Sequence, residues 1–337
     1  MAYDVKVSID LAKPLGVLGF GIPLVLLENA DSAVDYTEVS SLTDVKEAGF
    51  DATSAVYKAA QLMFAQNHAP KKIAVCAVTG AATTALADKS LVDRDWRQLV
   101  VINGGETAST VAAVSAAVEA LERKMYFANL AANDNTTLTA ASSPRDHTVL
   151  FYCTPTDSVP CPVAALVGEA AGQAAGSFTY KNLILNGIDP QNLTDLEITA
   201  IHTKGGITFV TKAGDNVTSE GKTAGGEFID IIDSEDYIIQ QLAYQTQRLL
   251  NSSAKVPYDN NGIAMLESIA MNVLQTAYNN GIIGTKDDGS PAYSVAYALR
   301  EDTKETDRLA RKYYGGSFSF MLAGAIHHVE ITGEITA

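Results

Sequence analysis

The feature that most constrains this fold is the alternation of apolar and polar residues at both ends of the chain, a pattern typical of β-strands. In the last stretch the apolar side chains fall on one side of two successive extended segments: Phe318, Phe320 and Leu322, then Val329, Ile331 and Ile335. A strand with an apolar side and free backbone groups invites pairing with another chain. Chain ends are usually loose and polar, so an apolar strand there needs a partner.

The chain also begins with such a strand. Residues 3–11 alternate cleanly and place on one side Tyr3, Val5, Val7, Ile9 and Leu11. Pro14 and the glycines that follow it separate this strand from the rest of the sequence. Strand-like arms, residues 1–20 and 315–337, are therefore expected on either side of the body.

Residues 21–180 predict an α/β domain. The apolar runs indicate strands at 24–28, 72–78, 97–103, 125–131 and 147–154, and the helical spacing of apolar residues indicates helices at 51–67, 106–124 and 161–175. Strands that alternate with helices favour a mostly parallel sheet covered on both faces.

In residues 181–314 strands and helices no longer alternate, and the sequence predicts an α+β domain. Segment 206–233 indicates two strands around a loop rich in Gly, Asn and Asp. Two long helices follow, at 234–251, capped by Ser234 or Asp233, and at 259–280, capped by Asp259 and ended by Gly281. A hairpin-like stretch, 290–299, then leads into a helix at 302–314. The fold class is thus α/β, and α+β in its C-terminal part, with two globular domains between the arms.

The bulk composition limits the classes of function. The chain has 337 residues and a formal net charge of −15, which speaks against sequence-independent nucleic-acid binding because that needs a basic surface. The longest uncharged stretches, 14–27 and 73–87, are shorter than a membrane span, and the N-terminus has no signal-peptide order. The three cysteines lack CxxC spacing and are expected to be reduced packing residues in a cytosol.

The sequence carries no recognisable catalytic or metal-binding set. The five histidines show no HExxH spacing, and the adjacent His327 and His328 would point to opposite faces of a strand. The loop around Gly104 and Gly105 follows a strand and opens a helix, where α/β proteins hold phosphates, but it lacks GxGxxG and a GK[ST] lysine. We therefore expect no enzyme, no cofactor and no metal, and a phosphate site at Gly104–Gly105 remains the alternative.

One charged feature stands out in the predicted helix at 302–314. Four basic residues share one face of that helix: Lys304, Arg308, Arg311 and Lys312. In so acidic a chain this basic stripe could meet an acidic partner. An ordinary solvated face with i, i+4 ion pairs explains the same spacing equally well.

The C-terminal sequence resembles that of contractile tail sheath proteins. The similarity lies in "RLARKYYGGSFSFMLAGAIHHVEITGEI" (308–335), where a helix with Arg and a Gly turn precede an alternating strand, "GAIH" and a last strand near "GEI". The order of "KNLILNGI" (181–188), a helix at 194–204 and the hairpin also fits that family. The resemblance is good over 180–337 and weaker before. The usual "WGaRT"-like stretch reads "EGKTAGG" (220–226) here, a departure that suggests a small, divergent sheath.

The resemblance implies an outer domain at 21–180, an inner sheath domain at 181–314 and arms that exchange between neighbouring subunits, here about 3–12 and 317–336. It also implies helical polymerisation around a tail tube and contraction that drives the tube through a cell envelope. The tube would face the basic stripe, and baseplate and tail terminator proteins would close the ends. The subunit would be assembled in the bacterial cytoplasm and belong to a virion tail or a phage-tail-like particle.

Two other functions remain open on the sequence. One is an α/β enzyme that binds a phosphate-containing ligand at Gly104–Gly105. The other is a structural protein that forms a non-contractile tube or a surface layer.

Overall fold

The structure is a computed structural model of the chain, and it describes residues 20–102, 107–121, 123–131 and 145–327. The N-terminal arm residues, Gly104–Gly105 and the second half of the C-terminal arm with Val329, Ile331 and Ile335 lie outside these ranges. The chain divides into two compact units, which within the described residues are 20–248 and 249–327.

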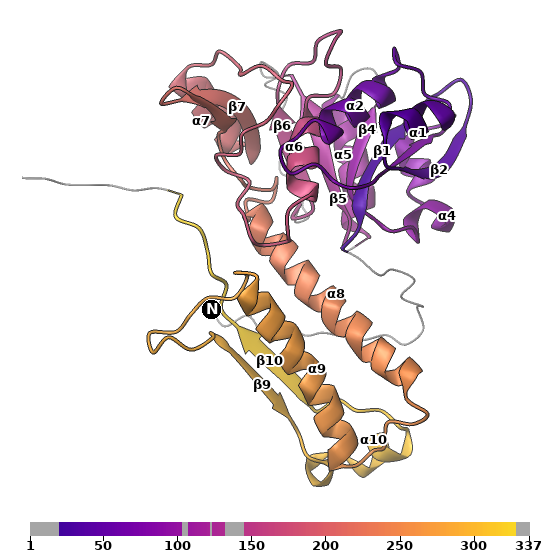
Figure 1. Cartoon of the computed structure of the whole chain (residues 1–337), viewed down its shortest axis with the longest axis vertical. Helices are drawn as coiled ribbons and strands as arrows, with labels where there is room; N and C mark the ends of the chain where they lie inside the picture. The colour runs from indigo at the N-terminus through magenta and orange to yellow at the C-terminus, as the bar shows by residue number, and fades with distance from the viewer. Residues whose placement is uncertain (1–19, 103–106, 122, 132–144, 328–337) are drawn as a thin grey trace, which may run out of the picture. The chain divides into compact units, whose positions relative to one another are not determined.

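The first unit is built on one eight-stranded sheet of order β2-β3-β1-β4-β5-β6-β7-β8 (Figure 1). Neighbouring strands from β3 to β7 run parallel, whereas β2 and β8 lie antiparallel at the two edges. The strands are β1 (Ile22–Leu27), β2 (Val34–Val39), β3 (Ile73–Ala77), β4 (Trp96–Ile102), β5 (Met125–Leu130), β6 (Thr148–Tyr152), β7 (Gly206–Lys212) and β8 (Asp215–Thr218). The expected mostly parallel α/β sheet is confirmed.

Helices cover both faces of this sheet, as the apolar runs of its strands require. In β1 the side chain of Val25 lies in the core shared with α2 and α6, while Leu24 and Leu26 lie in the core shared with α3 and α5. The helices are α1 (Leu42–Glu47), α2 (Ala55–Phe64), α3 (Ala82–Ala85), α4 (Lys89–Val92), α5 (Ala108–Glu119), α6 (Val163–Ala171) and α7 (Asp195–Thr203). The sequence patterns missed β2, α1, α3 and α4, which are short.

The hairpin predicted within 206–233 is present as β7 and β8. Its turn residues Ala213 and Gly214 have φ angles of 52° and 97°, as a two-residue hairpin turn with both central residues left-handed requires. Strands β7 and β8 continue the first sheet, and the two compact units of the chain meet at Arg248 and Leu249.

Of the two long helices predicted in the C-terminal part, the first begins earlier than expected. Helix α8 (Ile229–Ser252) begins five residues before the predicted 234, so Asp233 and Ser234 are not its caps but lie buried inside it. In contrast, α9 (Asn260–Asn279) is capped as predicted, since the Asp259 side chain accepts from the backbone N–H groups of Asn261 and Gly262.

The second unit combines α9 with a small antiparallel ribbon (Figure 1). The ribbon consists of β9 (Tyr293–Tyr297) and β10 (Gly316–Phe320), in a register that sets Phe318 opposite Val295 and Phe320 opposite Tyr293. Between the two strands the chain forms a 3₁₀ turn, η1 (Arg300–Asp302), and a short helix, α10 (Glu305–Leu309).

Candidate functional site

The first half of the C-terminal arm does not extend away from its own unit. Phe318 and Phe320 pair with β9, and the segment around Leu322 pairs with residues 282–284 through an isolated bridge between Ile283 and Leu322. The expectation that 317–322 lacks backbone partners in its own chain is therefore wrong. Segment 290–299, which the sequence predicted to be hairpin-like, contains the single strand β9. An edge of β9 is therefore open, and β10 pairs with it.

The outer edge of β10 nevertheless has no strand beside it in the described residues. Met321 N donates to Ala292 O at 2.8 Å and Ala298 N donates to Gly315 O at 2.9 Å. Since antiparallel strands alternate the direction of their backbone groups, the N–H and C=O groups of Phe318 and Phe320 point away from β9. A further strand could add along this edge, and a two-stranded ribbon alone is only marginally stable.

The predicted basic helix at 302–314 is also wrong. Helix α10 covers Glu305–Leu309 alone, Lys304 is its N-cap residue, and Arg311 follows it with a φ of 56°. The guanidinium of Arg308 donates to the carbonyl oxygens of Thr303 and Arg300 and so holds the turn together. The four basic side chains therefore do not form one helical stripe, although Lys304, Arg311 and Lys312 are exposed.

Aromatic packing explains why this helix stops early. The ring of Tyr313 stacks on Tyr297 at 5.9 Å and meets Tyr258 edge-on at 6.0 Å. Its hydroxyl donates to Ala298 O at 2.8 Å. These contacts draw residue 313 onto the end of β9 and the start of α9, which is incompatible with a helix that continues to 314. Leu309 and Tyr314 remain largely exposed, at 78% and 71%.

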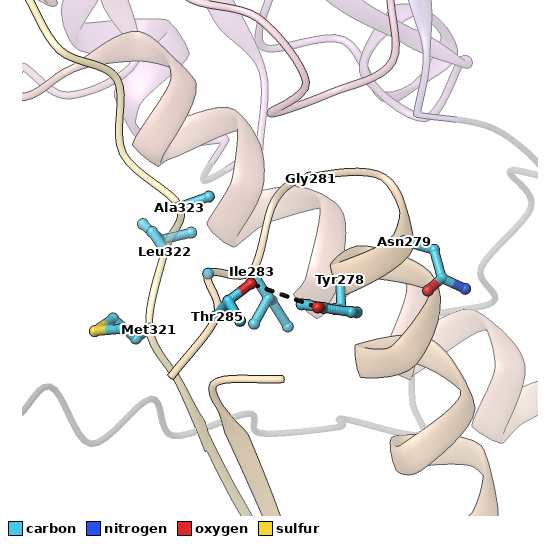
Figure 2. A pocket seen from close by; sticks show the side chains of 9 residues that line it. Tyr278, Asn279, Gly281, Ile283, Thr285, Met321, Leu322 and Ala323 are labelled. Carbon is cyan, nitrogen blue, oxygen red and sulfur yellow. Dashed lines mark hydrogen bonds between the residues drawn. The ribbon is translucent and has the colours of Figure 1, made fainter. Parts of the chain in front are cut away.

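A hollow lies beside the C-terminal end of α9 (Figure 2). It is lined by Tyr278, Asn279, Gly281, Ile283, Gly284, Thr285, Met321, Leu322 and Ala323. The hydroxyl groups of Tyr278 and Thr285 approach to 3.4 Å across its rim. No charged side chain lines the hollow, so it lacks the groups that would hold a phosphate or a metal ion.

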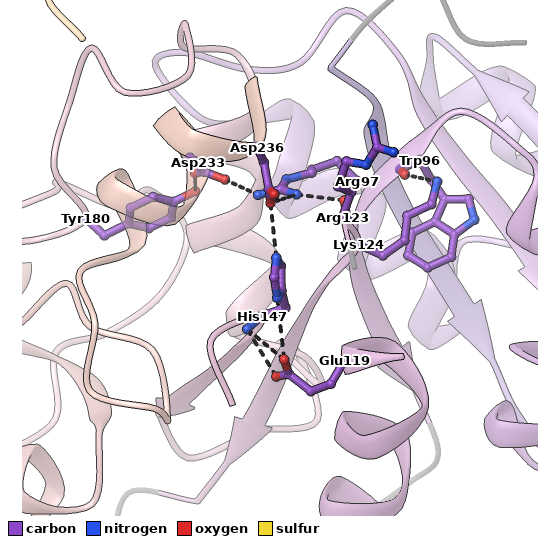
Figure 3. A network of polar contacts seen from close by, with 9 residues as sticks. All are labelled: Trp96, Arg97, Glu119, Arg123, Lys124, His147, Tyr180, Asp233 and Asp236. Atoms are coloured by element: carbon purple, nitrogen blue, oxygen red, sulfur yellow. Dashed lines mark hydrogen bonds and ion pairs between the residues drawn. The ribbon is translucent and has the colours of Figure 1, made fainter. Parts of the chain in front are cut away.

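A buried ionic network at the start of α8 was not predicted from the sequence (Figure 3). We call it the α8-root cluster, and it comprises Arg97, Glu119, His147, Tyr180, Asp233 and Asp236. The Arg97 guanidinium, 2% exposed, contacts Asp233 Oδ1 at 2.7 Å and Asp236 Oδ2 at 2.6 Å. His147 Nε2 lies 3.1 Å from Asp236 Oδ2, and His147 Nδ1 lies 3.4 Å from Glu119 Oε2.

The electrostatics of this cluster keep His147 positively charged near neutral pH. Burial by itself would lower the pKa of His147, but the hydrogen bonds to Asp236 and Glu119 raise it to about 9. For Asp236, burial opposes ionisation, yet the Arg97 guanidinium and His147 hold the pKa of the carboxyl below its usual range. Two cations thus face three carboxylates inside the fold.

Other functions receive no support from the described residues. Within those ranges no group of three or more His, Cys, Asp or Glu side chains could hold a metal ion. None of the helices described is long and apolar enough to cross a membrane. The cysteines 76, 153 and 161 are free and buried, as expected for packing residues.

Comparison with known proteins gives one family match. Residues 229–335 match the family model described as the E217 tail sheath protein gp31-like C-terminal domain. No curated protein matches the chain.

Solved structures share the fold over nearly the whole chain. A chain of the anti-feeding prophage helical sheath in its contracted state is similar with a TM-score of 0.69 and 15% identity, covering 98% of both chains. A chain of the PVC sheath complex, an extracellular contractile injection system in the contracted state, gives a TM-score of 0.70 at 13% identity, covering 99% of this chain and 98% of that one. A chain of the anti-feeding prophage baseplate structure gives 0.70 at 15%, with the same coverage.

The fold described above, with a large α/β unit and a smaller unit made of a helix and a ribbon, is therefore shared with chains of contractile sheath structures. Residues 229–335 match the model of a tail sheath C-terminal domain, and the resemblance to contractile tail sheath proteins that the sequence indicated is confirmed.

Proposed function

We propose that this chain is the repeating subunit of a contractile sheath, which polymerises helically around a tail tube and shortens to drive that tube through a cell envelope. The observation that carries the proposal is the match of residues 229–335 to a tail sheath C-terminal domain. The likeness in fold to chains of contracted sheaths over nearly the full length supports it. No comparison favours a phosphate-binding enzyme or a non-contractile tube protein.

Strand addition links the subunits in this proposal. The arm residues near the N-terminus and those from about 324 onward pair with a neighbouring copy, and the outer edge of β10 is the acceptor in each unit. Support comes from the backbone groups of Phe318 and Phe320, which pair with no strand among the described residues and which a strand from another chain would satisfy by main-chain hydrogen bonds. Such a contact joins different surfaces and does not close on itself, so it propagates as a filament.

The tube is the proposed inner partner, and the exposed Lys304, Arg311 and Lys312 are the proposed contacts to an acidic tube surface. Arg308 belongs to this set by sequence, but its hydrogen bonds to Thr303 and Arg300 give it a role inside the turn. Baseplate and terminator proteins are the proposed partners at the two ends. Assembly takes place in the bacterial cytoplasm, and the finished subunit belongs to a phage tail or a phage-tail-like particle.

Contraction requires no catalysis in this proposal. Arms that stay paired keep the subunits connected while their globular units move, and the energy comes from surfaces that are better packed in the shortened state. The subunit therefore acts as a structural protein without cofactor or nucleotide.

Electron microscopy of the purified chain tests this function directly. We expect hollow, cross-striated cylinders of a single width. Monodisperse small oligomers would contradict a sheath. Cylinders whose axial rise per subunit is the same under every condition would indicate a tube that does not contract.

A further inference from the structure

Helix α8 carries the chain from the first unit into the second, because the division between the units falls at residues 248 and 249 within it. Every buried residue of α8 lies between Ile229 and Ala243, and none of its residues from Tyr244 to Ser252 is buried. The contacts that tie α8 to the sheet of the first unit lie in its N-terminal part, where Ile229 belongs to the apolar core and Asp233 and Asp236 bind Arg97. Whatever fixes that part also fixes the direction in which the chain leaves the sheet.

Apolar contacts alone define such a direction poorly. Ile229, Ile238 and Leu242 are buried along α8, but apolar side chains of similar volume tolerate small shifts and rotations of a helix. Charged hydrogen bonds tolerate less, because the donor and acceptor atoms must meet at fixed distances and angles.

The two carboxylates of α8 in the cluster supply this restraint. Asp233 and Asp236 are three residues apart, so they share one face of the helix, and both bind the single guanidinium of Arg97. A guanidinium is planar and offers its donors in a rigid fork. Turning α8 by one residue, about 100°, would carry both carboxylates away from Arg97.

Arg97 is itself held in place. Its Nη1 also donates to Arg123 O at 2.6 Å, and its guanidinium lies over the ring of Phe20 at 4.7 Å from the ring centre. The carboxylates are contacted from further directions as well, because Tyr180 donates to Asp233 Oδ2 at 2.9 Å and His147 lies against Asp236. Groups from β4, from the residue before β6 and from the segment after α6 thus converge on one turn of α8.

A buried ion-pair network is by itself weak evidence of a gain in stability. Replacing a buried ion-pair network by apolar residues of similar volume is often neutral or stabilising, whereas such networks can specify one geometry among several. Ile229, which lies in the apolar core of the first unit, shows that this part of α8 accepts apolar side chains.

We propose that the α8-root cluster is a positioning device that sets the direction in which α8 leaves the first unit. If the chain is a sheath subunit, as proposed above, the cluster thereby determines where residues 249–327 stand in the assembled particle. Arg97 is the central positioning residue, and His147 holds the same oxygen of Asp236, Oδ2, that Arg97 contacts.

A distance measurement across the two units tests this proposal. Spin labels are attached at Ala200→Cys on α7 and Met271→Cys on α9, which are both exposed, whereas the native cysteines are buried. Labelled full-length chains are diluted into unlabelled ones so that pulsed electron paramagnetic resonance reports distances within one chain. We expect a single narrow distribution for the otherwise unchanged protein.

Arg97→Lys is the decisive variant, because it keeps the charge and removes the fork. We expect the distribution of distances between the two spin labels to be at least about twofold wider than in the parent. Glu38→Gln is the matched control, since it removes the exposed Lys72–Glu38 pair (3.5 Å) in the same unit and should leave the width unchanged. A wide distribution in the parent, or a parent-like width in Arg97→Lys, would overturn the proposal.

A second variant separates positioning from stability. The combination Arg97→Met, Asp233→Leu and Asp236→Leu replaces the ion pairs between α8 and Arg97 by apolar contacts and leaves His147 paired with Glu119, so the distance distribution should widen while the chain stays folded. A narrow distribution in a folded triple variant would also overturn the proposal, and if the triple variant does not fold, Arg97→Lys decides alone. The proposed sheath function is tested by a different experiment: it is wrong if the parent chain forms no striated cylinders in the electron microscope.

Discussion

Arg97 places a positive charge near the start of a buried strand, and two carboxylates from a helix more than a hundred residues later in the chain bind it. Removing one partner from a buried pair leaves the other charge without compensation, which costs far more than loss of an exposed pair. The same residues that orient α8 are therefore sensitive points for stability when they are changed one at a time.

Asp236→Ala should lower the free energy of unfolding by about 3 to 5 kcal/mol, because it leaves both Arg97 and His147 without a shared carboxylate in a buried site. Glu38→Ala, which removes an exposed partner of Lys72, should change it by less than about 1 kcal/mol. Urea unfolding followed by circular dichroism measures both. Equal effects of the two substitutions would show that the α8-root cluster is not energetically distinct from the surface.

His147 makes a pH-dependent contribution whose sign follows from its raised pKa. In the unfolded chain its pKa is near 6.5 and in the fold about 9, so the stabilisation is fully present below about pH 6.5 and is lost as the pH rises through about 9. The groups that face His147 are Glu119, Asp236, Arg97, Asp146 and Glu235.

The difference in unfolding free energy between the parent and His147→Gln should therefore shrink as the pH increases from about 6.5 to 9, by at most about 3 kcal/mol. Taking the difference between the two proteins removes the pH dependence of other groups, such as Lys124. Urea unfolding at a series of pH values provides the measurement. A difference that does not vary with pH would mean that His147 is neutral in the fold.

At the scale of elements, the segment between β9 and β10 depends on Tyr313. Its ring contacts with Tyr297 and Tyr258 and its hydrogen bond to Ala298 O hold the end of a segment whose only helix has five residues. A helix that short has little stability of its own, so the tertiary contacts determine the conformation of residues 300–315.

Tyr313→Ala should leave α9 folded but increase amide hydrogen exchange over residues 300–315, because the aromatic anchor of that segment is lost. Tyr313→Phe keeps the ring contacts and removes only the hydrogen bond to Ala298, so its effect should be small, about 1 kcal/mol. Hydrogen exchange read by mass spectrometry distinguishes the two variants. Unchanged exchange in Tyr313→Ala would show that the segment is held by other contacts.

The proposed tube contact belongs to the same segment. Changing Lys304, Arg311 and Lys312 together to Glu should weaken co-sedimentation of the sheath with purified tail tubes and spare self-assembly, because these side chains are exposed and make no contact that the fold requires. Arg308 is left unchanged, since it supports the turn. Undiminished co-sedimentation would remove these residues from the tube interface.

The elements also show what sequence patterns can predict. Long apolar runs such as Ile73–Ala77 and Met125–Leu130 revealed their strands, because a strand buried on both faces must be apolar throughout. The start of α8 was misplaced because Asp233 resembles a cap locally, and its partner Arg97 is 136 residues away. The length of the helix at 302–314 was overestimated because its charged residues favour helix locally. Tyr313 instead packs on the rings of Tyr297 and Tyr258, which are distant in the sequence. The α8-root cluster left no periodic signal in the sequence at all.

At the scale of the whole molecule, the family resemblance was visible in the C-terminal sequence, but the position of the exchanging segment was not. The sequence assigned residues 317–336 to a single arm, whereas 316–323 are paired within their own unit. In the proposed strand exchange, the segment that remains available therefore begins after Ala323. Most of the residues that would pair with a neighbouring subunit, 328–337, therefore lie outside the described ranges.

Deleting residues 328–337 should accordingly abolish polymerisation without unfolding the chain, because β10 and its contacts with β9 and residues 282–284 remain. Replacing the same ten residues by a Gly/Ser sequence of equal length is the matched control for chain length, and it should fail to polymerise as well, since it cannot supply an apolar strand. Electron microscopy and sedimentation detect the polymers, and circular dichroism reports the fold. Striated cylinders formed by the Gly/Ser chain would mean that the subunits are joined by their globular surfaces, and strand exchange at this end would then have no part in holding the sheath together.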